Sequence, residues 1–306
     1  AAAGIALIPP EAGVEADGGA GVGIELGPKD SILNFHDAPQ GGALPVDELA
    51  RQLQSKVLQM YDEFLTPDGK AVNFDKMRGS KAFADYVRQT ASLREPSITG
   101  QLLEMGHAER QALFINVYNS LILHATIALE GRGPSSPDHR GPFFSGESGA
   151  RYNIGGTAFS LDDIEHGILR GSPKGDKRSF TPEDPRLRLA AKGTEPRLHF
   201  ALNCGARSCP PIKLYTGENL EEGLTAAAEA FLESECTVDL TARKVTLSRI
   251  LMWYGVDFGD GEEAVLRRVC GFMKEGSAGR RDLEALLSGG EYEVVFSEYD
   301  WSTNSA

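Results

Sequence analysis

Apolar residues recur at helical spacing over several long segments of this chain. After Pro45 they fall every three or four residues as far as Phe64, and Asp47 and Glu48 stand at the start of this segment. A proline followed by acidic residues favours a helix N-terminus. The same spacing predicts further helices around Phe83–Val87, Leu220–Leu232, Arg249–Tyr254, Glu262–Lys274 and Asp282–Leu287.

One further predicted helix, roughly Ala108–Leu129, is apolar nearly all round, so we expect it to be central and buried. Its polar residues fall within one arc of about 140° at 100° per residue. They also interrupt its longest apolar run, which therefore cannot span a membrane. Because buried polar groups need partners, this polar stripe either holds irregular backbone in place, which we favour, or orients a catalytic group. The stripe consists of Asn116, Asn119, Ser120 and His124.

Shorter segments with alternating or compact apolar patterns predict strands. Two hairpins are expected, one from Tyr152–Ile154 and Ala158–Phe159, the other from Thr237–Leu240 and Lys244–Leu247. Single strands are expected at Leu198–Asn203 and Tyr292–Phe296.

Helices outnumber strands, and the two kinds are segregated along the chain, which favours an α+β fold. We expect one helix-rich globular domain over residues 46–306, with a small antiparallel sheet or hairpins. Residues 131–149 and 171–196 are predicted loops. Ser160 and Asp163 are spaced as a capping box for a helix over Leu161–Arg170.

Residues 1–45 have a different composition. Gly, Ala and Pro fill 23 of these positions, and Lys29 is the single base against six acids. Such a segment buries too little apolar surface to offset its ordering entropy, so we expect it to be extended unless another surface holds it. The chain starts with Ala1 rather than Met, which is compatible with processing. We therefore expect an organelle lumen, the periplasm or secretion, with the cytoplasm still open.

The charge of the chain limits its partners. With 31 Lys and Arg residues against 44 Asp and Glu residues, the formal charge is −13. An acidic surface repels nucleic acid and anionic lipid, so neither is an expected partner. Four cysteines in 306 residues do not make a disulfide framework. We expect no cofactor.

The segment from His199 to Pro211 carries the densest candidate chemistry. Along the predicted strand, His199, Ala201 and Asn203 share a face, and Cys204 follows at the strand's end. Cys204 and Cys209 are five residues apart, a spacing too loose to indicate zinc, so no metal is expected. Three alternatives stay open: two small buried residues, a thiol nucleophile, or a redox or structural disulfide.

The segment Ser160–Arg170 is a weaker candidate. His166 and Arg170 lie one helical turn apart, and Glu165 is expected to face away from them. Glu and His together would permit a general base or a metal ligand, but we favour a solvated or salt-bridged helix.

The chain resembles the domain-of-unknown-function 547 family over roughly residues 46–304. The shared strings are Phe114–Asn119 followed by His124, Tyr152–Gly156, Ser160–Arg170, His199–Pro211 and Tyr299–Trp301. Some members of this family are described as thiol-related or redox proteins. The resemblance implies one spatial cluster without assigning it a reaction: Asn116, His124, Glu165, His199, Cys204 and Cys209.

Two kinds of function follow as hypotheses. The first is an accessory subunit that docks onto a larger protein complex, possibly a membrane complex, through the N-terminal extension and one face. The second is a cysteine-dependent enzyme for acyl transfer or hydrolysis, or a thiol redox protein. In the enzyme, Cys204 would be the nucleophile and the Gly205–Ser208 amides an oxyanion hole. Its base would be His199 or His124, and its orienting residue Asn116 or Glu165.

Overall fold

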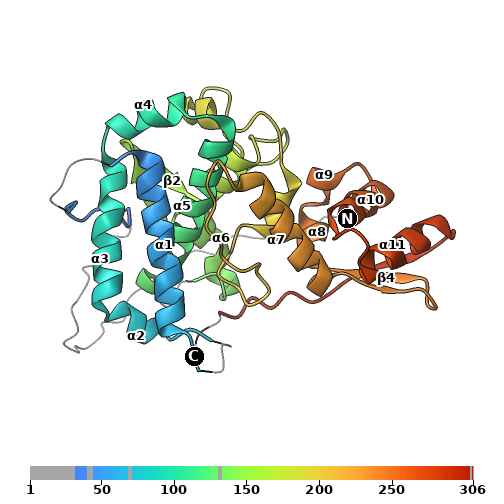
Figure 1. The fold of residues 1–306 in the computed structure, drawn as a ribbon. Helices are drawn as coiled ribbons and strands as arrows, with labels where there is room; N and C mark the ends of the chain where they lie inside the picture. Colours follow the sequence, from blue (N-terminus) through green and yellow to red (C-terminus); the bar gives the residue numbers. More distant parts are fainter. Residues whose placement is uncertain (1–31, 40–43, 68–70, 130–132, 304, 306) are drawn as a thin grey trace.

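The computed structural model describes residues 32–39, 44–67, 71–129, 133–303 and 305, and it has the expected α+β architecture (Figure 1). The first half is helical. Its elements are α1 (Val46–Phe64), α2 (Phe74–Arg78), α3 (Lys81–Thr90), the 3-10 helix η1 (Ala91–Arg94), α4 (Ser97–Glu104), α5 (His107–Ala128) and α6 (Pro137–Ser145). Helix α6 corrects the prediction of a loop over residues 131–149, since Pro137 in its first turn starts a helix there.

Helix α5 is the buried centre of the molecule, with α1 packed along it (Figure 1). The amide side chain of Asn116 donates to the Tyr215 carbonyl at 2.7 Å and accepts from the Tyr215 N–H at 3.1 Å. Asn119 donates to the Ala201 carbonyl at 3.1 Å and accepts from the Asn203 N–H at 2.9 Å. Both asparagines therefore hold irregular backbone against the central helix.

The first predicted hairpin is confirmed as β1 (Arg151–Ile154) and β2 (Thr157–Ser160), paired antiparallel. At its turn, Gly155 has φ +59°, and a Cβ there would lie 2.3 Å from Thr99 Oγ1, so the position requires glycine. The capping box is also present, with reciprocal bonds of 2.9 and 3.1 Å between Ser160 and Asp163. The helix that follows, η2 (Asp163–Leu169), has π-helical turns.

The predicted strand at Leu198–Asn203 is wrong. After the 3-10 helix η3 (Pro185–Leu189), this region forms a second 3-10 helix, η4 (Pro196–Phe200), and then irregular backbone. Glu195 caps η4 by accepting from the Arg197 N–H at 3.0 Å, and Pro196 occupies its first turn. His199, Ala201 and Asn203 consequently do not share a strand face.

The C-terminal part combines helices with a three-stranded sheet. It comprises α7 (Leu220–Glu235), β3 (Thr237–Asp239), β4 (Lys244–Leu247), α8 (Arg249–Trp253), α9 (Gly255–Phe258), α10 (Glu262–Phe272), α11 (Ala278–Ser288) and β5 (Glu293–Phe296). Strands β3 and β4 form the second expected hairpin. Strand β5 pairs with β4 in parallel, because the chain crosses over through α8 to α11 before it returns, so this sheet is mixed.

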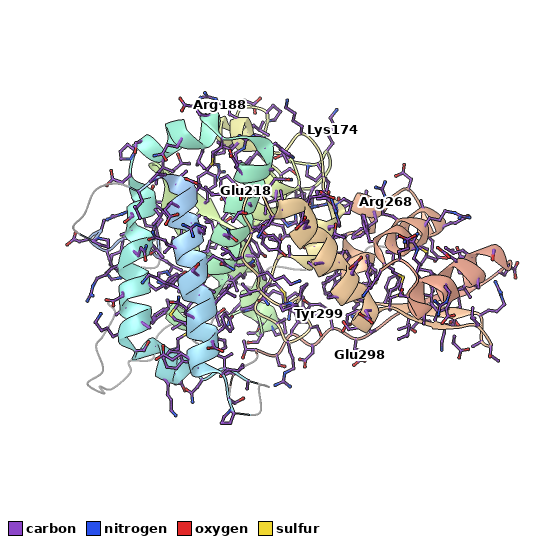
Figure 2. All side chains as sticks on the ribbon, viewed as in Figure 1. Lys174, Arg188, Glu218, Arg268, Glu298 and Tyr299 are labelled. Atoms are coloured by element: carbon purple, nitrogen blue, oxygen red, sulfur yellow. A yellow bond between two sulfur atoms is a disulfide. The ribbon has the colours of Figure 1, made fainter. Side chains whose placement is uncertain are left out.

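Buried apolar residues form two clusters. The larger core surrounds α5, and the smaller one lies between α7, α10, α11 and the three-stranded sheet. Helix η4 joins them, since Leu198 belongs to the larger cluster and Phe200 to the smaller. After β5 the chain returns toward the larger core, where Ser305 bridges Val72; Figure 2 labels Glu298 and Tyr299 on this return.

The described end of the N-terminal extension packs on the globular body. Leu33 is buried in the larger core, and Asn34 is fully buried. Asn34 donates to the Thr90 and Asn153 carbonyls at 3.1 and 2.8 Å. The docking hypothesis depends on residues 1–45, of which residues 1–31 and 40–43 lie outside the described residues. None of the helices described is long and apolar enough to cross a membrane.

Candidate functional site

A pocket of about 800 Å³ lies between the two apolar cores. The larger core side contributes Tyr118, Asp162, Glu165, His166 and His199, and the smaller core side contributes Ile250, Trp253 and Tyr254. Helix α6 and the C-terminal return complete the wall with Arg140, Tyr299 and Trp301. The volume and the mixture of aromatic and polar walls suit a small-molecule site.

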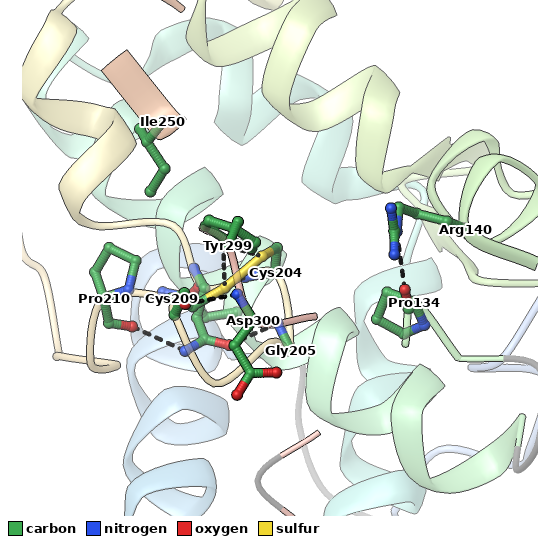
Figure 3. The surroundings of a disulfide bond; sticks show 12 residues. Pro134, Arg140, Cys204, Gly205, Cys209, Pro210, Ile250, Tyr299 and Asp300 are labelled. Atoms are coloured by element: carbon green, nitrogen blue, oxygen red, sulfur yellow. Dashed lines mark hydrogen bonds between the residues drawn. A yellow bond between two sulfur atoms is a disulfide. The ribbon is translucent and has the colours of Figure 1, made fainter. Parts of the chain in front are cut away.

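A disulfide between Cys204 and Cys209 closes the loop that borders this pocket, with 6.1 Å between the two Cα atoms. Cys204 faces the pocket, whereas Cys209 borders a separate hollow of about 360 Å³. The Tyr299 hydroxyl lies 3.0 Å from Cys204 Sγ and 3.2 Å from Cys209 Sγ (Figure 3). The Cys204 N–H donates to Cys209 Sγ at 3.0 Å. Each sulfur therefore has a polar neighbour suited to a thiolate.

The disulfide loop also holds the C-terminal return in place. Arg207 N–H donates to the Ser302 carbonyl at 2.9 Å, and Ser208 N–H donates to the Asp300 carbonyl at 3.3 Å. In the opposite direction, Asp300 N–H donates to Ser208 Oγ at 2.9 Å. Since Gly205 N–H donates to Asn203 Oδ1 at 2.8 Å, the amides of Gly205, Arg207 and Ser208 are all engaged. These three amides are therefore not free to form the oxyanion hole expected from the sequence.

Aromatic rings line the same side of the pocket. The Trp253 and Tyr299 ring centroids lie 4.9 Å apart, and those of Tyr299 and Trp301 lie 4.8 Å apart. The Arg140 guanidinium lies 3.6 Å above the centre of the Trp301 ring and donates to the Pro134 carbonyl at 3.0 Å (Figure 3). A cation over an indole is attractive, so Arg140 reinforces this wall.

Glu165 belongs to a polar end of the pocket that also includes Asp162 and His166. Tyr118 and Tyr254 donate their hydroxyl protons to its two oxygens at 3.0 and 2.6 Å. Burial alone would raise the pKa of Glu165, but His166 and the two tyrosines favour the carboxylate and hold the pKa below its usual range. The expectation that Glu165 faces away from His166 is wrong: within the π-helical turns its Oε1 lies 3.6 Å from His166 Nε2.

Asp162 completes this end of the pocket, and its oxygen Oδ1 lies 3.7 Å from His166 Nε2. Burial, together with repulsion by Glu165, raises the pKa of Asp162 to about 7. Burial likewise lowers the pKa of His166 to about 4, so its imidazole is neutral at pH 7. Two neighbouring carboxyl groups thus differ in protonation, one ionised and one able to carry a proton near neutrality.

A buried ion-pair network lies behind the polar end. Arg170 donates to Asp257 through Nε at 2.6 Å and Nη2 at 2.8 Å, and to Asp176 at 2.6 Å. His199 Nε2 lies 2.7 Å from Asp257 Oδ2, and at most 4% of the Arg170, Asp257 and His199 side chains is exposed. Burial would raise the pKa of Asp257, but the bonds from His199 and Arg170 lower it to about 2. The network joins η2, η4 and α9 at the seam between the cores.

The structure divides the six residues that the family resemblance grouped together. Glu165, His199 and Cys204 border the pocket, and Cys209 joins them through the disulfide. Asn116 instead holds the backbone at Tyr215, as described above. The sixth residue, His124, does not border the pocket.

His124 lies in the larger core, away from the pocket-lining residues. Its Nδ1 lies 2.9 Å from the Tyr152 hydroxyl, and its ring packs edge-on against Phe83 and Tyr86. Burial lowers the pKa of His124 to about 3. Among the described residues, no imidazole lies within hydrogen-bond distance of Cys204 Sγ, whose side-chain partner is Tyr299. Neither His124 nor His199 is therefore placed as a base directly on this sulfur.

Several residues of the site were not among the sequence candidates: Asp162, Tyr254, Asp257, Tyr299 and Trp253. Tyr299 carried a signal, since it opens the closing string of the family resemblance. Asp257 carried none, because it reaches Arg170 across 87 positions of sequence. In the described part of the chain, no group of three or more His, Cys, Asp or Glu residues is arranged to hold a metal ion.

Comparison with known proteins gives a family and no further relative. No curated protein matches the chain, and no solved structure does. Residues 102–232 match the family model described as "Protein of unknown function, DUF547". This segment holds α5, the first hairpin, η2 and the disulfide loop. The resemblance seen in the sequence is thus confirmed over residues 102–232, which match the model of the DUF547 family.

Proposed function

We propose that the chain is a thiol–disulfide redox protein whose Cys204–Cys209 disulfide exchanges with a dithiol substrate entering the pocket. The observation that carries this proposal is the placement of the disulfide: Cys204 faces the pocket, and Cys209 is backed by two hydrogen-bond donors. Those donors are the Cys204 N–H and the Tyr299 hydroxyl. Burial raises the pKa of Tyr299 well above its usual range, which keeps this hydroxyl protonated and able to donate.

The proposed reaction is a two-electron exchange. A substrate thiolate attacks Cys204 Sγ, a bond forms between the two sulfurs, and the electron pair of the Cys204–Cys209 bond leaves on Cys209. The second thiolate of the substrate then attacks the substrate's first sulfur in the mixed disulfide. The substrate disulfide forms, and Cys204 leaves as a thiolate. The substrate is oxidised from dithiol to disulfide, while the protein disulfide is reduced and takes up the two protons lost by the substrate. Donors at Cys209 favour the first step because they lower the pKa of the leaving thiol.

Trapping of the mixed disulfide tests this proposal. In Cys209→Ser the thiol of Cys204 is free, and we expect it to form a stable adduct with glutathione disulfide, seen by intact-protein mass. In Cys204→Ser the remaining thiol faces the smaller hollow, and we expect at least tenfold slower adduct formation. Cys270→Ser is the matched control, because Cys270 is a buried free thiol.

Two results would contradict the redox assignment. One is equal reactivity of the Cys204 and Cys209 thiols in the two single variants. The other is a wild-type disulfide that dithiothreitol leaves intact until the protein is unfolded. The first would show that the pocket does not make Cys204 the preferred point of attack, and the second that it does not admit a thiol to the disulfide.

The accessory-subunit hypothesis stays a prediction, since residues 1–31 are outside the described part of the chain. Its test is removal of residues 1–45, with co-purification of the partner complex as the measurement. Undiminished co-purification of the truncated chain would contradict it. Acyl transfer is the less favoured enzyme reaction, because it needs reduced Cys204 and the nearby amides already have acceptors.

A further inference from the structure

The polar end of the pocket contains a buried donor without a partner. Only 1% of the His166 side chain is exposed, and no described residue forms a hydrogen bond with its Nε2. Arg170 Nη1 lies 2.6 Å from His166 Nδ1. Asp176 Oδ2 lies 3.2 Å from the same nitrogen, but its hydrogen bond comes from Arg170 Nη1 at 2.6 Å. Because a guanidinium only donates, Nδ1 is the acceptor, and the proton of the neutral ring is on Nε2. A buried N–H left unpaired is costly, and the pocket is where a partner can reach it.

Acceptors surround this donor. Asp162 Oδ1 and Glu165 Oε1 lie 3.7 and 3.6 Å from His166 Nε2, too far for good hydrogen bonds but close enough to share one ligand atom with it. His199 also borders the pocket, and its Nε2 donates to the Asp257 carboxylate.

These partners select the kind of ligand group. A group bound here must accept from His166 and donate to Glu165 or Asp162. An ammonium group cannot accept, and a carboxylate cannot donate. A hydroxyl does both from one oxygen atom, and several hydroxyls on adjacent carbons can use His199 as well.

The remaining walls suit the carbon skeleton of such a ligand. Trp253, Tyr254 and Trp301 present aromatic rings to the same pocket, and 40% of Trp253 is exposed. Flat rings of this kind cover the apolar face of a small cyclic ligand. A pocket of about 800 Å³ falls within the range of small-molecule sites, so a sugar ring or two can be accommodated.

We infer that this pocket binds a neutral carbohydrate, with one hydroxyl shared by His166, Glu165 and Asp162 and the ring against Trp253 and Tyr254. This binding is independent of thiol exchange, since none of its contacts involves sulfur. The same pocket can therefore be tested for sugar binding whether or not the disulfide is reactive.

Intrinsic tryptophan fluorescence provides the assay, because both tryptophans of the chain, Trp253 and Trp301, line the pocket. The full chain is titrated with methyl glucoside, methyl galactoside, sucrose and maltose, and in parallel with glucosamine and glucuronate. We expect a saturable signal from at least one neutral sugar and weaker binding of both charged analogues. The Cys204→Ser/Cys209→Ser double variant should bind equally well, which separates this inference from the proposed redox function.

Substitutions at the polar end locate the site. His166→Phe removes the unpaired donor and should weaken binding about tenfold, the value of one hydrogen bond to a neutral group. Asp162→Asn probes the same end at a more exposed position and covers the case in which His166→Phe does not fold. His107→Phe is the control, an exposed histidine on α5. Binding by no sugar of the panel, tighter binding of a charged analogue, or unchanged affinity in the folded pocket variants would overturn the inference.

Discussion

Replacement of Arg170 by methionine is the sharpest test of how the two cores are joined. Methionine is an uncharged, unbranched side chain. The substitution therefore removes the guanidinium and leaves His199 as the remaining side-chain partner of the Asp257 carboxylate. Arg170 makes two bonds to Asp257 and one to Asp176, and only 4% of its side chain is exposed. Breaking a buried ion pair by removing one partner costs about 3–5 kcal/mol of unfolding free energy, because the other charge stays buried.

The pH dependence follows from Asp257. Its folded pKa of about 2 is below the usual unfolded value of about 3.9, so the folded state gains stability above pH 4. That gain is about 2.6 kcal/mol at neutral pH, since one pKa unit is 1.36 kcal/mol, and it disappears as the pH falls to 2. Arg170→Met should therefore be most destabilising at pH 7 and clearly less so at pH 3.

Urea unfolding followed by circular dichroism measures both effects. The control is Arg267→Met on α10, where Arg267 pairs with Glu263 and 62% of each side chain is exposed; we expect a change within about 0.5 kcal/mol there. Asp257→Asn in the Arg170→Met background should recover part of the loss, because it removes the stranded charge. A loss below about 1 kcal/mol at pH 7, or an equal loss at pH 3, would refute the role assigned to this network.

Three further predictions concern the pocket. The Cys204→Ser/Cys209→Ser variant should lose about 2 kcal/mol, the loop-closure value for so short a loop, and its urea midpoint should no longer respond to dithiothreitol. Asp162→Asn should stabilise the protein by up to about 4 kcal/mol at pH 8 and by little at pH 4, measured by urea unfolding. Because the pKa of Asp162 is raised to about 7, the folded wild-type protein binds more protons than the unfolded chain between pH 4 and pH 8. Wild-type stability therefore falls as the pH rises through this range, whereas the asparagine does not titrate. Tyr299→Phe should slow disulfide reduction by dithiothreitol about tenfold, measured by alkylation and mass, because the leaving thiolate on Cys209 loses a donor.

The longer helices, such as α1, α5, α7 and α10, were predictable from the sequence because their apolar residues are spaced for burial, whereas the short helices α2, α4, α6 and α9 were not predicted. The strand error at Leu198–Asn203 has the opposite cause. Its apolar residues alternate, as in a strand, but they alternate between two cores: Leu198 faces the larger and Phe200 the smaller. A 3-10 helix, with about three residues per turn, also delivers neighbouring side chains to different sides. Pattern alone does not distinguish these two arrangements.

The candidate site was predictable only where its partners are close in sequence. Cys204 and Cys209 are local, and so is the Ser160–Asp163 cap. The bonds of Glu165 to Tyr254 and of Arg170 to Asp257 cross 89 and 87 positions, and they depend on how the C-terminal helices pack on η2. No local spacing contains that information.

The same long-range bonds explain how the polar groups of the pocket are held in place. At the polar end, Tyr254 and Asp257 from the smaller core satisfy Glu165, Arg170 and His199 from the larger one, so the seam is held by buried, mutually satisfied charges. Such networks lose much when any member is removed, which makes this wall resistant to opening. The wall formed by the disulfide loop and the C-terminal return is held instead by hydrogen bonds between neutral groups and by contacts between its tilted aromatic rings. Access to the pocket is therefore expected from the side of Tyr299 and Trp301, where the disulfide is also located.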